Sequence, residues 1–267
     1  MTVFQAVVLG VLQGLAEFLP ISSSAHLALA PWLFGWPDPG LSFDVALHVG
    51  TLAAVLWFFR REWIRLAAAA WRIVLQRGAR TAEEWRVIYL IIATIPGGIG
   101  GLVLNKYAES AFRSPALIAG TLTVMGILLW AIDRITPATR PLDSVRWTDA
   151  LLVGIAQVFA LIPGVSRSGS TITAGRALRL DRQSAAVFSF LMSMPITAAA
   201  ALLEVPKAIH AGGFGLPLAV GVLASAISGW LAIGVLLRYV SRNNYAVFAI
   251  YRIILAAAVL FVYFRRG

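Results

Sequence analysis

Two polar stretches interrupt an otherwise apolar chain of 267 residues: QGLAEFLPISSSAH at residues 13–26 and PGVSRSGST at residues 163–171. Each lies within apolar surroundings and contains a proline followed by several hydroxyl side chains. An ionisable group at membrane depth is costly unless it faces a partner or a water-filled cavity. Glu17, His26 and Arg167 are therefore candidate functional residues, and we expect the two stretches to decide how the chain folds.

The composition indicates an integral membrane protein. Hydrophobic residues make up 60% of the chain and charged residues only 13%, so a water-soluble domain could not cover its surface with polar groups. Spanning helices need about 20 predominantly apolar residues. Six such spans are predicted, at residues 41–59, 87–104, 114–132, 183–203, 211–237 and 243–264.

The net charge of +10 does not indicate a nucleic-acid partner. Residues 60–86 connect two predicted spans and contain seven arginines. Cytoplasmic loops of membrane proteins concentrate Lys and Arg in this way. The first part of this loop, REWIRLAAAAWRIVLQR, suits a helix that lies in the headgroup region. The chain has no cysteine, which excludes a disulfide framework, a thiolate nucleophile and a cysteine-ligated metal.

An internal repeat organises the chain. LGVLQGLAEFLPIS at residues 9–22 resembles VGIAQVFALIPGVS at residues 153–166, with Gln13 matching Gln157. Three predicted spans follow each copy, and an odd number of spans inverts the second unit relative to the first. The sequence thus predicts a single membrane domain, residues 1–267, built from inverted repeats at about 1–135 and 145–267.

Each polar stretch is predicted to form a re-entrant helical hairpin, in which an apolar helix breaks at proline and a second short helix follows. Non-helical backbone at membrane depth is tolerated only where protein or a water-lined cavity satisfies it. The alternative is that residues 3–19 and 149–165 cross the membrane completely. The expected fold is all-α, a polytopic membrane protein with six transmembrane helices, two re-entrant hairpins and an inverted-topology repeat.

The first stretch carries groups suited to metal binding or to nucleophilic catalysis. Gln13 and Glu17 share one helix face because they are four residues apart. A carboxylate paired with an amide oxygen suits a divalent cation, Mg²⁺ or Ca²⁺, which takes further ligands from substrate phosphates; Glu17 could instead act as a base. Ser23 and His26 provide a hydroxyl near an imidazole, the basis of an activated nucleophile.

The second stretch has the character of an anion cradle. Gly164 and Gly169 permit tight turns, and backbone amides at a helix start attract phosphate. Arg167 can bind phosphate oxygens bidentately. Hydroxyl groups for helix capping come from Ser166, Ser168, Ser170 and Thr171.

Structural roles compete with these functional ones. A single serine in a membrane helix more often satisfies a backbone carbonyl or permits close packing, and His26 taken alone is as consistent with a satisfied core histidine as with catalysis. We favour a structural role for Arg252, as the partner of a buried carboxylate or with its charge reaching the interface. Arg176 and Arg179 are expected to face the headgroups.

The two motifs resemble those of a known family. QGLAEFLPISSSAHL is similar to the (E/Q)xxxE motif and following serine–histidine region of the membrane undecaprenyl-diphosphate phosphatases, the bacitracin-resistance family, and PGVSRSGST is similar to their PGxSRSGxT motif. The resemblance covers nearly the whole chain. It implies removal of the terminal phosphate from undecaprenyl (C55 polyprenyl) diphosphate, which recycles the lipid carrier for bacterial cell-wall synthesis, and dependence on a divalent cation.

The resemblance also implies a multi-pass protein of the bacterial inner membrane, with a polyprenyl diphosphate and the lipid bilayer as partners and a homodimer as a candidate assembly. Residue by residue, Glu17 resembles the catalytic or metal-binding carboxylate, Ser23 the nucleophile, His26 the general acid/base and Arg167 the phosphate-binding arginine. Gln13 stands where many members have Glu, which puts a two-carboxylate metal site in doubt. Supporting substrate contacts are expected from Ser22, Ser24, Gly164, Ser166, Ser168, Gly169 and Thr171.

His48 stands where relatives often carry Gln and receives no role. The expected mechanism is attack by Ser23 on the terminal phosphorus, with His26 or Glu17 taking its proton; direct attack by water is the alternative. A secondary transporter or flippase of a lipid phosphate is the rival function, because inverted repeats with broken helices are a transporter architecture.

Overall fold

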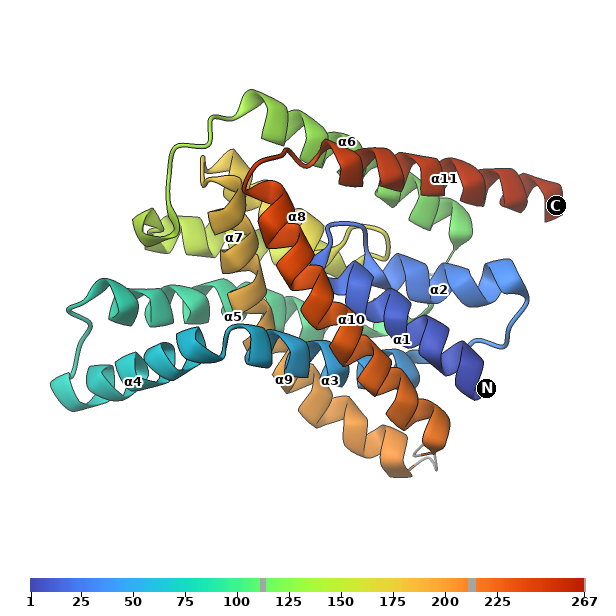
Figure 1. Ribbon diagram of the computed structural model, residues 1–267, viewed down its shortest axis with the longest axis horizontal. Helices are drawn as coiled ribbons and strands as arrows, with labels where there is room; N and C mark the ends of the chain where they lie inside the picture. Colours follow the sequence, from blue (N-terminus) through green and yellow to red (C-terminus); the bar gives the residue numbers. More distant parts are fainter. Residues whose placement is uncertain (111–113, 211–214, 267) are drawn as a thin grey trace.

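The computed structural model describes residues 1–110, 114–210 and 215–266 (Figure 1). In these residues the regular structure is helical. In chain order the elements are α1 (Val3–Phe18), α2 (Ser23–Phe34), α3 (Leu41–Phe58), α4 (Arg60–Gln76), α5 (Ala82–Ser110), α6 (Pro115–Ile135), η1 (Leu142–Ser144), α7 (Trp147–Val158), η2 (Phe159–Leu161), α8 (Arg167–Ala177), α9 (Arg182–His210), α10 (Leu216–Val240) and α11 (Ala246–Arg266).

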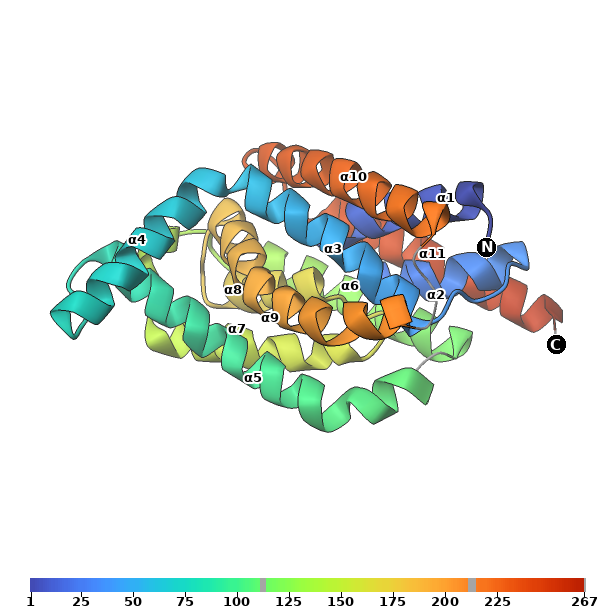
Figure 2. The same ribbon diagram turned by 90° about the horizontal axis from the view of Figure 1, so that it is seen from below.

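The predicted all-α polytopic membrane fold is confirmed. Among the described residues, five helices are long and apolar enough to cross a membrane, and a sixth span is added if the bent pair α3–α4 counts as one. That pair bends by 82°, so α4 leaves the line of α3 as the separate helix that the arginine-rich segment predicts (Figure 2). The predicted span at 211–237 begins in residues 211–214, which lie outside the described residues, and α10 covers the remainder.

The two polar stretches form helix–turn–helix hairpins. The 16 residues of α1 extend about 24 Å, less than the roughly 30 Å of the hydrocarbon core. The chain then turns at residues 19–22, and α2 runs back beside α1 (Figure 1). In the second hairpin, Trp147–Leu161 is likewise shorter than a span, and α8 packs against α7. These lengths favour re-entrant hairpins over two complete crossings.

Helix packing follows one pattern in both halves of the chain. α1 packs against α10 as α7 packs against α5, and α10 contacts α3 as α5 contacts α9. The pairs α3–α9 and α6–α11 join equivalent helices of the two halves, and α6 and α11 run side by side in Figure 1. A repeat relation would produce this arrangement; the repeat bounds and their inverted orientation stay predictions.

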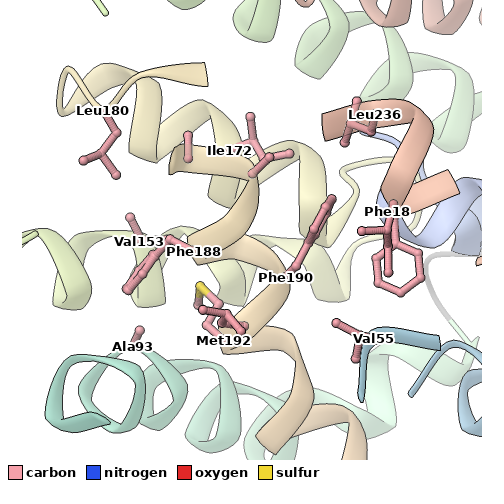
Figure 3. Close-up of a cluster of buried hydrophobic side chains, with 14 of the residues drawn as sticks. Phe18, Val55, Ala93, Val153, Ile172, Leu180, Phe188, Phe190, Met192 and Leu236 are labelled. Carbon is pink, nitrogen blue, oxygen red and sulfur yellow. The ribbon is translucent and has the colours of Figure 1, made fainter. Parts of the chain in front are cut away.

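The largest hydrophobic core surrounds α9. Phe188, Phe190 and Met192 project from this helix in different directions (Figure 3), and each is at most 1% exposed. The ring of Phe190 meets that of Phe18 edge to face, with centroids 5.3 Å apart. Phe18 follows Glu17 directly in α1, so the core fixes the end of the helix that carries the candidate carboxylate.

Glycine lets α1 lie unusually close to α10. A Cβ atom added at Gly14 would come within 2.0 Å of the Ser228 hydroxyl oxygen, and one at Gly10 within 2.2 Å of the Gly221 carbonyl oxygen. Small residues at such contacts allow close backbone approach between membrane helices. The depth and rotation of α1, and hence the position of Glu17, depend on this contact.

The sequence predicts that Arg176 faces the headgroups, but its side chain is fully buried within the protein. Its Nε donates to Asp133 at 2.7 Å, and Asp133 also accepts from Arg182 at 2.9 Å and from the backbone N–H of Tyr245 at 3.1 Å. The prediction was wrong because the carboxylate that satisfies Arg176 comes from α6, 43 positions away. Arg179 is exposed.

Candidate active site

Both hairpin turns end in a serine with an unusual backbone conformation. Ser22 has φ 76° and Ser166 has φ 74°, and each caps the helix that follows, α2 or α8. Their hydroxyls accept hydrogen bonds from the N–H groups of Ala25 at 3.4 Å and Gly169 at 3.0 Å. Positive φ at a residue other than glycine is costly, and it is found preferentially at functional sites. The two turns therefore place Ser23 and Arg167 equivalently, each as the first residue of its helix.

Glu17 joins the two hairpins. Its Oε1 accepts a hydrogen bond from Nη2 of Arg167 at 2.6 Å, although 150 positions separate the two residues. Its Oε2 accepts from the Ser23 hydroxyl at 2.6 Å and from Nε2 of Gln13 at 3.0 Å. The carboxylate is 7% exposed, so an acid, an alcohol and a guanidinium from both predicted motifs meet in one buried cluster.

This cluster opens on a cavity of about 220 Å³ between the hairpins. Its polar wall consists of Glu17, Ser23, Ser24, His48, Gln157, Ser166, Arg167 and Thr197. Small and apolar residues from α3, α5, η2 and α9 complete the lining. The cavity therefore offers charge and hydroxyl groups on one part of its wall and apolar contact on the rest.

His26 is not brought to Ser23. Its Nδ1 lies 2.7 Å from the Ser22 carbonyl oxygen and its Nε2 lies 2.7 Å from the Tyr251 hydroxyl, with the two rings stacked. Because a carbonyl only accepts, Nδ1 carries a proton. Both ring nitrogens are thus engaged away from the cavity wall, and a role for His26 in proton transfer stays a prediction.

Most of the expected supporting contacts hold the hairpins together. The Ser168 hydroxyl donates to the Leu19 carbonyl at 3.1 Å, which links the second hairpin to the first turn. The Thr171 hydroxyl lies 2.7 Å from that of Ser189. Ser22 and Gly169 are occupied by the capping bonds described above. Of the predicted set, the cavity is lined by Ser24 and Ser166.

Gly164 is required by the turn itself. Its φ is +90°, and an added Cβ would lie 1.9 Å from the Thr121 hydroxyl oxygen. That hydroxyl donates to the Pro163 carbonyl at 2.7 Å. The glycine therefore lets the second turn lie directly against α6, and its expected contact with substrate stays a prediction.

His48 was assigned no role from the sequence, yet it lines the cavity. Its Nε2 lies 3.5 Å from Oε2 of Glu17, and its Nδ1 donates to the Asp44 carbonyl at 2.8 Å. The signal was present, since an ionisable group in the first half of a span is a functional candidate by default.

Arg252 binds both turns at once. This fully buried side chain donates through Nη1 to the Pro20 carbonyl at 3.0 Å and through Nη2 to the Gly164 carbonyl at 2.6 Å. Its Nε donates to the Leu122 carbonyl at 3.2 Å. The structural role expected for Arg252 is seen, but backbone carbonyls take the place of the expected carboxylate.

The donor set fits a cation shared with substrate rather than one held by protein alone. In the described part of the chain, no group of three or more His, Asp and Glu residues could hold a metal ion. Glu17 lines the cavity, and Oε1 of Gln13 is buried beside it without a described hydrogen-bond partner. One carboxylate with substrate phosphate oxygens is a common arrangement for Mg²⁺.

Sequence comparison gives the family. The family model "Bacitracin resistance protein BacA" matches residues 6–258. The chain belongs to the BacA family. An undecaprenyl-diphosphatase of Gemmatimonas aurantiaca is 61% identical over 259 residues, which cover 97% of each chain. An undecaprenyl-diphosphatase of Moorella thermoacetica is 52% identical over the full length of both chains, and that of Pelotomaculum thermopropionicum is 50% identical over 260 residues, 97% of this chain and 96% of that protein. The BacA match covers the second hairpin, all but the first three residues of α1 in the first hairpin, the four spanning helices α5, α6, α9 and α10, and the first 13 residues of α11.

Proposed function

We propose that this protein is an undecaprenyl-diphosphatase of the bacterial inner membrane, which removes the terminal phosphate of the C55 polyprenyl diphosphate and so recycles the lipid carrier for cell-wall synthesis. The observation that carries the proposal is the contact of Glu17 with both Ser23 and Arg167 beside a cavity. Full-length similarity to proteins named for this activity supports it.

In the proposed reaction, the Ser23 hydroxyl oxygen attacks the terminal phosphorus. The bond from phosphorus to the bridging oxygen breaks, the polyprenyl monophosphate leaves, and the serine proton passes to Glu17, whose Oε2 already accepts it at 2.6 Å. Water then hydrolyses the phosphoserine. Phosphoryl transfer spreads charge over the equatorial oxygens, which Arg167 can stabilise. In the alternative, a water molecule held by Glu17 attacks directly.

We also propose that a divalent cation, Mg²⁺ or Ca²⁺, takes part, held by Glu17 together with phosphate oxygens of the substrate. Such a cation supplies neutralisation of phosphate charge. Gln13 directs its amide N–H at Glu17, so its contribution is to orient the carboxylate, and its free Oε1 is the remaining candidate ligand. Removal of divalent cations with EDTA is expected to abolish phosphate release, and addition of either cation to restore it.

The lipid tail has an apolar groove next to the cavity. A groove of about 550 Å³ lies between α4, α5 and α9, with a wall that includes Trp63, Leu90 and Pro195. Gly97 of α5 lines the polar cavity, whereas Gly98 lines the groove. We place the diphosphate in the cavity and the start of the polyprenyl chain in this groove.

Phosphate release by the purified protein tests the function. We expect the protein in detergent to release phosphate from undecaprenyl diphosphate, and Glu17→Gln and Arg167→Ala to abolish release while the proteins remain folded, which excludes a contaminating phosphatase. A lipid-phosphate flippase would translocate the lipid without releasing phosphate. Membership of the BacA family favours the phosphatase.

A further inference from the structure

Gln157 lines the cavity with no hydrogen-bond partner among the described residues. Gln157 on α7 is 3% exposed and lines the cavity. Within the described part of the chain, neither its Nε2 nor its Oε1 has a hydrogen-bond partner. Burial of an amide without hydrogen bonds is costly, and such groups are rare in folded proteins. The free protein therefore holds the Gln157 amide in a position where its N–H and C=O groups make no hydrogen bond within the described part of the chain.

Gln13 has a carboxylate partner that Gln157 lacks among the described residues. The two glutamines occupy matching positions in the predicted repeats, and Gln13 donates to Glu17, four residues further on, at 3.0 Å. Four residues after Gln157 the chain has Leu161. The second hairpin therefore repeats the amide but omits the carboxylate that would accept from it, and the described residues offer Gln157 no hydrogen-bond acceptor.

The neighbouring helix is shaped around this amide. A Cβ atom added at Gly97 of α5 would lie 2.2 Å from Nε2 of Gln157 and 2.9 Å from the Ile196 side chain. Gly97 also lines the cavity. The glycine thus leaves the amide against the cavity, where Arg167 and Ser166 belong to the same wall.

We propose that Gln157 is a ligand of the substrate diphosphate: its Nε2–H donates a hydrogen bond to a phosphate oxygen, which takes the place that Glu17 has against Gln13. This inference rests on the proposed function, since it assigns the ligand of the same cavity to a lipid diphosphate. Gly98, the residue after Gly97, lines the groove in which we place the start of the polyprenyl chain.

The test compares Gln157→Leu and Gln157→Glu with the wild-type protein. The probe is farnesyl methylenediphosphonate, in which a methylene group replaces the bridging oxygen so that no phosphate is released, and its affinity is measured by calorimetry in detergent. Loss of one hydrogen bond to a charged group corresponds to roughly a 10- to 100-fold weaker Kd. We expect this loss in Gln157→Leu and a larger one in Gln157→Glu, whose carboxylate repels the diphosphonate.

A stability measurement separates binding from a structural role. Gln157→Leu removes a buried amide without partners, so we expect the free protein to unfold at the same or a higher temperature while its affinity falls. Gln183→Leu makes the same change on the exposed side of α9 and is expected to leave affinity unchanged. Unchanged affinity in Gln157→Leu would overturn the inference, as would a loss of affinity explained by a lower unfolding temperature.

Hydrolysis by the wild-type protein distinguishes this inference from the proposed function. If the wild type releases phosphate from undecaprenyl diphosphate but Gln157→Leu matches it in KM and Kd, the function stands and the role of Gln157 is refuted. If the wild type releases no phosphate yet binds the diphosphonate through Gln157, the inference stands and the phosphatase is refuted. A wild type that does not bind the probe refutes the role of Gln157.

Discussion

The carboxylate of Glu17 has its two oxygens divided between the hairpins. Oε1 pairs with Arg167, and Oε2 accepts from Ser23 and Gln13. This division ties folding to chemistry at a single residue, because the groups that hold the hairpins together are also those proposed to move the proton and stabilise the phosphate.

Glu17 and Arg167 should therefore affect stability as well as activity. Removal of one partner of a buried ion pair leaves an uncompensated charge and costs about 3–5 kcal/mol. We expect Glu17→Gln and Arg167→Met each to lower the unfolding temperature and abolish phosphate release. The double variant is expected to recover stability but not activity; additive losses in thermal unfolding would show that the pair is not coupled.

The contacts of His26 predict a smaller effect on catalysis. Since its ring is bonded to Ser22 and Tyr251 rather than to Ser23, we expect His26→Gln to lower kcat by less than about tenfold, below the 10²–10⁴-fold typical of a general acid or base. Tyr251→Phe should give a similar loss. A decrease in kcat comparable to that of Glu17→Gln would instead make His26 the proton-transfer group.

Among the elements, the two turns depend on one arginine from the last helix. Arg252 donates to carbonyls of both turns and of α6. We expect Arg252→Met to destabilise the protein by at least about 3 kcal/mol, because several buried carbonyls lose their donor at about 1–3 kcal/mol each. Phosphate release should fall as the hairpins separate, and thermal unfolding measures the loss.

Arg266→Met is the matched control. Arg266 also donates to two backbone carbonyls, those of Trp32 and Leu33, but at an exposed position. Its replacement is expected to change stability by less than about 1 kcal/mol, because water satisfies the released carbonyls. Equal losses in the two variants would contradict the role given to Arg252.

The hairpins could be predicted because their signals are local. Short apolar runs, a proline and a following row of serines are read directly from neighbouring residues, and the structure breaks the helices there. Arg176 could not be placed in this way. Its charge could be neutralised by a lipid headgroup or by a carboxylate distant in the chain, here Asp133, and neighbouring residues do not distinguish the two. Gln157 was missed as a cavity residue for a related reason, since only tertiary packing shows which face of a helix meets a cavity, whereas His48 could have been found from its ionisable side chain within a predicted span.

For the whole molecule, the adjoining cavity and groove predict a dependence on lipid chain length. An added Cβ at Gly98 meets no atom within 4 Å, so Gly98→Leu would fill the groove without disturbing the helix. We expect KM for the C55 diphosphate to rise about three- to tenfold, which corresponds to roughly 0.7–1.4 kcal/mol. The effect is modest because displaced methylene groups move into lipid rather than into water.

A five-carbon prenyl diphosphate occupies only the start of the groove, so its KM should rise less in Gly98→Leu than that of the C55 diphosphate. Gly101→Leu is the control: this glycine also has open space around its Cβ, is in the same helix, and is absent from the groove wall. An equal rise in KM for both lipids, or the same rise in both variants, would exclude the groove as the site of the tail.

The close contact of α1 with α10 also affects how a mutational survey of this protein would read. Gly10 and Gly14 touch no substrate in any proposed step, yet every replacement at either position would push α1 away from its neighbour and draw Glu17 out of reach of the opposite hairpin. Such a survey would score both positions as intolerant as the reacting groups themselves. An active site defined from mutational tolerance alone would therefore include residues that take no part in the reaction.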